Sequence, residues 1–251
     1  MPRDLMIHPL APAGERPPLV LVAHGSRDPR AQASTRALAR GVAAARPGLD
    51  VRSAFLELAE PSPARVLSAL RASGAPAPVV VPVLLTRAYH GRVDLPAQVA
   101  GFDCVLGGTL GTVSEPLLAG LTRRLREACP EYDAVVLAAA GTSVAAGRAT
   151  VAEVAAELGR RLRVPCEVAY ASAGGPGGAE AVTALRAAGA RRVAAAAYFL
   201  APGRLYDAVM SDALQAGAVG AAAPLGAARE LVRLVLAAAD AVAPQLALTA
   251  V

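Results

Sequence analysis

The chain contains two copies of one sequence pattern, and this internal repeat restricts its fold more than any other feature. Leu21–Ser26 (LVAHGS) matches Leu137–Thr142 (LAAAGT), 116 residues further along the chain. Ala69–Ala75 (ALRASGA) matches Ala184–Ala190 (ALRAAGA) with an offset of 115 residues. Self-similarity of this kind indicates that one structural unit is used twice.

Each copy alternates short apolar runs with longer alanine-rich amphipathic stretches. Continuous apolar strands separated by helices are typical of a parallel sheet that is covered on both faces. We therefore expect an α/β protein with two similar lobes, each a mostly parallel sheet flanked by helices. The expected strands are Leu19–Ala23, Val51–Leu56, Val79–Leu85, Cys104–Leu106, Val135–Ala139, Glu167–Ala171 and Val193–Leu200. The expected helices include Pro29–Ala45, Pro63–Ala72 and Ser114–Ala128, the last with a good helix start at Ser114.

The repeat also predicts the domain organisation. Residues 19–129 form the N-terminal lobe and residues 130–251 the C-terminal lobe, with a boundary near Pro130. Residues 1–18 contain charges and prolines but lack the continuous apolar segment (h-region) of a signal peptide, so we expect a disordered leader. Parallel sheets place the loops from their strand C-termini around a shared crevice. A cleft between the lobes is therefore the expected site.

The two copies differ where the first one carries chemically capable side chains. The backbone pattern is kept in the second copy, but the polar residues are lost. His24 corresponds to Ala140, Glu57 to Ser172 and His90 to Leu205. This asymmetry predicts one chemically active lobe and one structural lobe.

Two of the three histidines of the chain follow apolar strands and stand next to a glycine. They are His24 and His90, whereas His8 lies in the expected leader. If the first and third strands are neighbours, the two imidazoles come together. A neutral imidazole can bind a metal ion or accept a proton near neutral pH. The pair therefore predicts a metal or acid–base site, although His24 taken alone can equally be a residue hydrogen-bonded to its own loop.

Glu57 follows the second expected strand and can complete a set of two histidines and one carboxylate. Such a set suits a divalent ion such as Fe²⁺, Co²⁺ or Ni²⁺ and leaves coordination positions open. An ordinary solvated glutamate is the alternative reading. Ser26 can cap the helix that follows it. Asp94 is expected to cap or orient its loop and can hydrogen-bond His90.

Composition restricts the class of partner without deciding it. The net charge is +5, all 25 basic residues are arginines, and aromatic residues make up only 3% of the chain. Arginines suit an anionic small molecule by bidentate pairing as well as they suit a nucleic acid, but because they are dispersed and aromatic residues are few, we expect no nucleic acid. The chain is 55% hydrophobic, but its apolar runs are short, and we expect no membrane segment and a cytoplasmic location. The three cysteines show no CxxC spacing and are expected to be reduced.

Three segments of the first copy resemble the motifs of the class II chelatases, which are the sirohydrochlorin chelatases of siroheme and cobalamin synthesis. They are AHGSRDP at 23–29, AFLELAEPSP at 54–63 and VPVLLTRAYHGRVDLP at 81–96. The resemblance covers the whole chain, since long members of that family are tandem repeats whose second half has lost its histidines. A histidine-rich tail and an iron–sulfur cysteine cluster, present in some members, are missing here.

The resemblance implies insertion of Fe²⁺ or Co²⁺ into sirohydrochlorin by a two-lobed chelatase-like fold. It implies that His24 and His90 are catalytic and contact the metal, assisted by Glu57. The divalent metal is then a substrate, and no permanently bound cofactor is expected. Sirohydrochlorin carries carboxylates, and residues beside the motifs are candidates for binding it: Ser26, Arg27, Arg87, Tyr89 and Arg92. No phosphate-binding loop is present, so we expect no use of ATP, and we expect a monomer.

Two other functions remain open at this point. A non-catalytic carrier of metal or tetrapyrrole would use the same pocket. A metal-dependent hydrolase would use His24 with Ser26 as the nucleophile, although the chain lacks the G-x-S-x-G turn. Neither the physiological metal nor the choice between siroheme and cobalamin synthesis follows from the residues, because a site of this kind does not by itself reject Co²⁺ or Ni²⁺.

Overall fold

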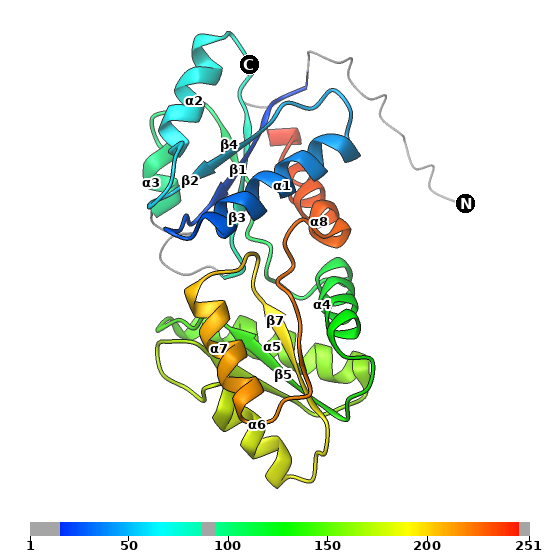
Figure 1. Cartoon of the computed structure of the whole chain (residues 1–251). Coiled ribbons are helices and arrows are strands. Elements are labelled where there is room, and N and C mark those ends of the chain that lie inside the picture. The colour runs from blue at the N-terminus through cyan, green and yellow to red at the C-terminus, as the bar shows by residue number, and fades with distance from the viewer. Residues whose placement is uncertain (1–15, 87–93, 246–251) are drawn as a thin grey trace, which may run out of the picture.

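The computed structural model describes residues 16–86 and 94–245 and contains two four-stranded parallel sheets. The first has the strand order β2-β1-β3-β4 and the second the order β6-β5-β7-β8. Each sheet belongs to one of two stacked lobes, and helices flank both sheets (Figure 1). The predicted α/β fold with two similar lobes is confirmed.

The elements alternate regularly along the chain. The first half contains β1 (Leu19–Ala23), α1 (Pro29–Ala45), β2 (Val51–Phe55), α2 (Pro63–Ala72), β3 (Val79–Val83), α3 (Leu95–Val99), β4 (Val105–Leu106) and α4 (Glu115–Ala128). The second half contains β5 (Ala134–Ala139), α5 (Ala145–Leu162), β6 (Cys166–Tyr170), α6 (Gly178–Ala187), β7 (Val193–Tyr198), α7 (Arg204–Gln215), β8 (Gly220–Ala221) and α8 (Arg229–Asp240).

Two strands, β3 and β7, end two residues earlier than their apolar runs predict, while β2 and β6 end one residue earlier. β3 ends at Val83 because the carbonyl of Leu84 accepts a hydrogen bond from the amide of Leu110 in a returning loop. β7 ends at Tyr198 for the same reason, since the carbonyl of Phe199 accepts from the amide of Leu225. The repeat therefore extends to the loops that cross the ends of the third strands.

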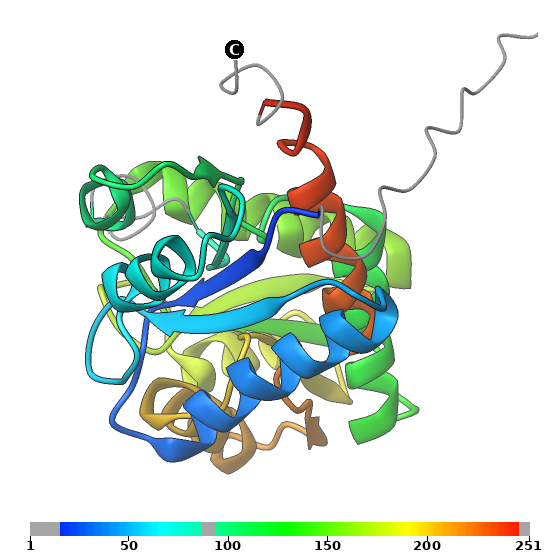
Figure 2. The same cartoon turned by 90° about the horizontal axis from the view of Figure 1, so that it is seen from above.

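The last helix of each half crosses to the other lobe. α4 packs against β7 and α5 of the second sheet, whereas α8 packs against α1 and β3 of the first. Figure 1 shows α4 beside the lower sheet and α8 beside the upper one, and Figure 2 shows α8 next to α1 from above. One hydrophobic cluster consequently runs through both lobes, from Leu21 in β1 to Leu137 in β5. The boundary near Pro130 stays a prediction, and the packing of the helices crosses it.

The predicted start of α4 at Ser114 is confirmed, but Ser114 does not cap the helix with its side chain. Ser114 is the N-cap residue of α4, but its hydroxyl makes no capping hydrogen bond and is buried without a partner among the described residues.

All three cysteines are free thiols, although only Cys129 is fully buried. None of the described helices combines the length and the hydropathy that a membrane crossing requires.

A buried ion pair joins the two crossing helices. Glu230 of α8 is 5% exposed, and its carboxylate accepts hydrogen bonds from Arg123 of α4 at 2.9 and 3.0 Å. The Arg229 guanidinium also donates to it at 3.1 Å. The hydrogen bonds from Arg123 are the largest cause that lowers the pKa of Glu230 to about 2. A buried carboxylate of this kind depends on its cation, because removal of either partner leaves a desolvated charge.

Glu230 is expected to make the stability of the protein depend on acid pH. Its pKa in the folded state lies below the ordinary value of 4.5, so its stabilising effect is complete above pH 4.5 and is lost as the pH falls toward 2. We expect Glu230→Gln to lower the free energy of unfolding at pH 7 by on the order of 3 kcal/mol. Below pH 4.5 the difference from the wild type shrinks.

The measurement is urea unfolding followed by circular dichroism at several pH values. The control is Glu115→Gln, which removes the exposed partner of Arg161 and is expected to change stability little. A constant gap between wild type and Glu230→Gln from pH 7 to pH 3 would show that the pair does not titrate as described.

Candidate functional site

The sheet order brings the ends of the first three strands together. β1 pairs in parallel with both β2 and β3, as the two-histidine hypothesis requires. Beyond the strands, the amide of Leu56 donates to the carbonyl of Ala23, and the amide of Glu57 donates to the carbonyl of His24. These two hydrogen bonds extend the pairing of β1 with β2 and place His24 and Glu57 side by side at the carboxyl edge of the sheet.

The side chains of His24 and Glu57 point toward one another. The Nε2 atom of His24 lies 3.4 Å from Oε1 of Glu57, and their side chains are 42% and 47% exposed. Nδ1 of His24 lies 3.2 Å from the carbonyl oxygen of Gly25. Because a carbonyl only accepts, this contact favours a proton on Nδ1, which leaves Nε2 as the nitrogen that can bind a metal ion.

This spacing suits two ligands of one metal ion. Ligand atoms 3.4 Å apart that each lie at about 2.1 Å from an ion subtend an angle of about 108° at it, which tetrahedral coordination accepts. The half-exposed pair is also open to an incoming ligand. Among residues 16–86 and 94–245, no group of three or more histidine, cysteine or acidic side chains can hold a metal. A third protein ligand would therefore have to come from elsewhere.

Gly25 makes the close approach of the two loops possible. Its φ is +98°, and a Cβ atom at this position would lie 1.7 Å from the backbone oxygen of Glu57. Only glycine combines this conformation with this contact. The glycine in the HG dipeptide therefore sets the distance between His24 and Glu57.

The predicted cap of the first helix, Ser26, is wrong: the helix is capped by Asp28. Ser26 does not cap α1. Its Oγ accepts a hydrogen bond from the amide of Asp28 at 3.0 Å, and Asp28 is the N-cap residue, accepting from the amide of Arg30 at 2.9 Å. An aspartate two residues further on, directly before a proline at the first helical position, provides the better capping geometry.

The His24 loop lies on the side of its lobe that faces the second lobe. Arg30, on the first turn of α1, donates to Asp28 and to Asp207 of α7, each at 2.6 Å. Both carboxylates raise the pKa of Arg30. Deeper between the lobes, the hydroxyl of Tyr198 in β7 lies 2.9 Å from the carbonyl oxygen of Leu85 and 2.6 Å from that of Gly111.

Asp94 is hydrogen-bonded to a glutamine of its own helix. It occupies the N-cap position of α3 but makes no capping hydrogen bond. Its Oδ1 accepts from Nε2 of Gln98 at 3.0 Å, and the same nitrogen lies 3.3 Å from the carbonyl oxygen of Leu56. Gln98 thus connects the start of α3 to the loop that carries Glu57.

The second lobe keeps the same backbone without the same side chains. Gly141 has a φ of +95°, as Gly25 does, and the amide of Ala171 donates to the carbonyl of Ala139. Ala140 stands in the place of His24. Ser172, in the place of Glu57, donates its hydroxyl to the carbonyl of Ala140 at 2.7 Å. This edge therefore offers no imidazole and no carboxylate at the corresponding positions.

The remaining predicted site residues divide into two groups. Arg27 is exposed and makes no hydrogen bond or ion pair with the described part of the chain. The others lie outside the described residues, so their roles stay predictions: His90, Arg87, Tyr89 and Arg92.

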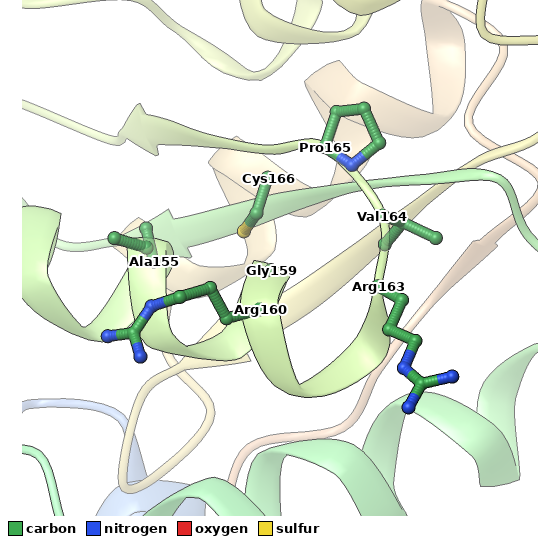
Figure 3. A pocket seen from close by; sticks show the side chains of 8 residues that line it. Ala155, Gly159, Arg160, Arg163, Val164, Pro165 and Cys166 are labelled. Carbon is green, nitrogen blue, oxygen red and sulfur yellow. The ribbon is translucent and has the colours of Figure 1, made fainter.

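A cavity of about 360 Å³ lies elsewhere, between the end of α5 and the start of β6. It is lined by Gly159, Arg160 and Cys166 among others, and Figure 3 shows both Arg160 and Arg163 at its rim. Burial raises the pKa of the Cys166 thiol to about 12, so this thiol is a poor nucleophile. The cavity lies at the amino end of β6, whereas ligands of parallel sheets bind at the carboxyl ends of the strands.

Three residues around the His24 site were not singled out from the sequence: Gln98, Arg30 and Tyr198. Gln98 stands four residues after Asp94, a spacing that places two side chains on one helix face and could have indicated the contact. Arg30 follows Asp28 closely, but its contact with Asp207 crosses between lobes. Tyr198 sits in an apolar strand, and no local signal marks the carbonyls that its hydroxyl meets.

Comparison with known proteins identifies the relatives of this fold. The CbiX family model matches the chain twice, over residues 18–128 and 134–242. No curated protein matches it significantly by sequence. SirB from Bacillus subtilis with Fe³⁺ has a TM-score of 0.77 and 22% identity over 91% of this chain and 96% of that one. SirB from Bacillus subtilis subspecies spizizenii in complex with cobalt has a TM-score of 0.76 and 20% identity over 91% of this chain and 96% of that one.

A third solved structure shares the two-lobed fold. CbiX, described as the terminal enzyme of siroheme biosynthesis in denitrifying bacteria, has a TM-score of 0.65 and 18% identity, covering 89% of this chain and 98% of that one. At these identities the three structures establish the fold, while the family model accounts for both halves of the sequence. This chain therefore belongs to the CbiX family, which confirms the resemblance of its motifs to the sirohydrochlorin chelatases.

Proposed function

We propose that this chain inserts a divalent metal ion, Fe²⁺ or Co²⁺, into sirohydrochlorin without ATP, in the synthesis of siroheme or cobalamin. The observation that carries the proposal is the half-exposed pair of His24 Nε2 and Glu57 Oε1, 3.4 Å apart, in a member of the CbiX family. The SirB structures with iron and with cobalt support a metal as substrate.

In the proposed reaction the metal ion first binds between Nε2 of His24 and the carboxylate of Glu57. The macrocycle then gives up two pyrrole N–H protons while its nitrogens replace the protein ligands one at a time. One metal ion enters, two protons leave, and the charge balances. An imidazole suits this step because it can release a metal ion and accept a proton at the same nitrogen. His90 is proposed as the second such group.

The polar rim of the site is proposed to hold the carboxylates of the substrate. Arg27 follows Ser26 in the loop that begins with His24, and it is exposed. A guanidinium binds a carboxylate with two parallel hydrogen bonds, which fixes orientation as well as position. Arg87, Tyr89 and Arg92 are proposed for the same role from their motif, and Asp94 with Gln98 is proposed to orient the loops around it.

The test is catalytic turnover of the purified full chain. Sirohydrochlorin and Co²⁺ or Fe²⁺ are mixed in at least a twentyfold molar excess over protein, and the absorbance spectrum of the macrocycle is followed under anaerobic conditions. We expect many insertions per chain at a rate well above that of the protein-free reaction. A single insertion per chain would indicate a carrier, and a rate equal to the uncatalysed one would refute the proposed enzyme.

A further inference from the structure

Leu58, the residue after Glu57, has a conformation that is unusual for its type. Its φ is +59°, in the left-handed region that glycine and asparagine normally occupy. Only three residues other than glycine have positive φ values in the described part of the chain: Leu58, Arg163 and Ala173. A leucine at such a position is strained, so its presence calls for a compensating interaction.

Both lobes have the positive φ at this position, but only the first lobe has a large side chain there. Ala173 is the repeat counterpart of Leu58 and has a φ of +64°. The loops agree in hydrogen bonding too, since the amide of Phe55 donates to the carbonyl of Pro61, and that of Tyr170 to the carbonyl of Pro176. Where the second lobe has lost the imidazole and the carboxylate, it has also reduced this leucine to a methyl group.

The Leu58 side chain is half exposed as well as strained. Its exposed fraction is 50%, the highest among the exposed large hydrophobic residues of the described chain. It therefore contributes little to the core of the folded protein. A single exposed leucine is ordinary, but this one follows in the chain the glutamate whose carboxylate stands 3.4 Å from His24.

We propose that Leu58 contacts an apolar face of the macrocycle and is a further substrate-binding residue of the site. The inference rests on the proposed function. A flat conjugated ring with carboxylates at its edge needs an apolar contact beside its metal-entry point as well as arginines around its rim. Leu58 supplies this contact, and binding of the ring buries its exposed apolar surface.

The test separates ligand binding from folding by using glycine. Leu58→Gly removes the side chain and also relieves the strain, so the midpoint of thermal unfolding is expected to stay the same or rise by about 2 °C. The dissociation constant for metal-free sirohydrochlorin, measured by fluorescence titration, is expected to rise about tenfold. The KM for sirohydrochlorin rises in parallel, while kcat stays within about twofold, because uniform binding has been removed.

Matched variants complete the experiment. Ala173→Gly relieves the same strain in the second lobe and is expected to leave binding unchanged. Leu58→Asn keeps a residue suited to positive φ but removes the apolar surface, and it is expected to weaken binding as Leu58→Gly does. Leu214→Ala removes another leucine that is 46% exposed, on the last turn of α7, and is expected to bind as the wild type does.

The possible results lead to different conclusions. Wild-type affinity in both Leu58→Gly and Leu58→Asn, with normal metal insertion by the wild type, would overturn the role of Leu58 and leave the proposed function intact. Binding of the macrocycle that depends on Leu58, without any metal insertion by the wild type, would refute the enzyme and keep the contact. No binding by the wild type would refute both.

Discussion

Replacement of His24 by alanine is expected to slow Co²⁺ insertion into sirohydrochlorin by at least about 100-fold, the usual effect of losing a group that transfers protons in the transition state. Nε2 of His24 lies 3.4 Å from Glu57, so the variant also loses half of the pair that we propose binds the metal. The carboxylate alone gives a weak ligand set for Co²⁺. The initial rate of the absorbance change at saturating substrate measures the loss.

This loss is expected without unfolding. The His24 side chain is 42% exposed, and surface substitutions usually change the free energy of unfolding by no more than about 0.5 kcal/mol. The control is Ser172→Ala, which alters the counterpart of Glu57 in the second lobe and is expected to keep the wild-type rate. Full activity in His24→Ala would remove His24 from the mechanism.

Gly25→Ala is expected to have the largest effect on stability. The new methyl group would start 1.7 Å from the backbone oxygen of Glu57, at a φ of +98°. The left-handed conformation and the steric clash together are expected to lower the free energy of unfolding by about 3 kcal/mol or more. Because the clash pushes the Glu57 loop away from His24, metal insertion is expected to fall as well. Urea unfolding at 25 °C measures the first effect.

Gly74→Ala separates the cost of the left-handed backbone conformation from the cost of the steric clash. Gly74 has a φ of +71°, but a Cβ atom there would have nothing within 4 Å. Its replacement is expected to cost only the backbone penalty of about 1 kcal/mol and to leave activity unchanged. Equal losses of stability in the two variants would show that the contact between Gly25 and Glu57 does not constrain the site.

The parts of the fold that follow from local patterns could be predicted from the sequence. α1 and α2 begin and end at the predicted residues, because each starts with a proline after a capping side chain and carries a clear apolar stripe. β8, with only two residues, was not predicted, since a glycine and an alanine carry no strand signal. The ends of β3 and β7 depend on loops that arrive from elsewhere in the chain.

Two residues of the candidate site could be predicted from the sequence, but the contacts between the lobes could not. The repeat comparison singled out His24 and Glu57 because their counterparts, Ala140 and Ser172, lack the same chemistry. The contact of Arg30 with Asp207 and the crossing of α4 and α8 could not be predicted. They join residues far apart in sequence, and a repeat indicates that two units exist but not which helix covers which sheet.

From the repeat and the geometry of the site, we propose that one lobe binds the metal while the other supports it. α4 of the first half covers the second sheet, and α8 covers the first, so neither sheet keeps its own last helix. We infer that the second copy has been retained for this packing and for the surface that faces His24. A duplicated fold can lose the ligands of one site without losing the contacts that hold both lobes together.

The most direct test of this account is a calorimetric titration of the full chain with Co²⁺. The account predicts about one ion per wild-type chain, binding at least about tenfold weaker in His24→Ala and in Glu57→Gln, and unchanged binding in Ser172→Ala. Two equivalent ions per chain, or wild-type affinity in His24→Ala, would contradict the claim that the metal binds at a single site built on His24 and Glu57.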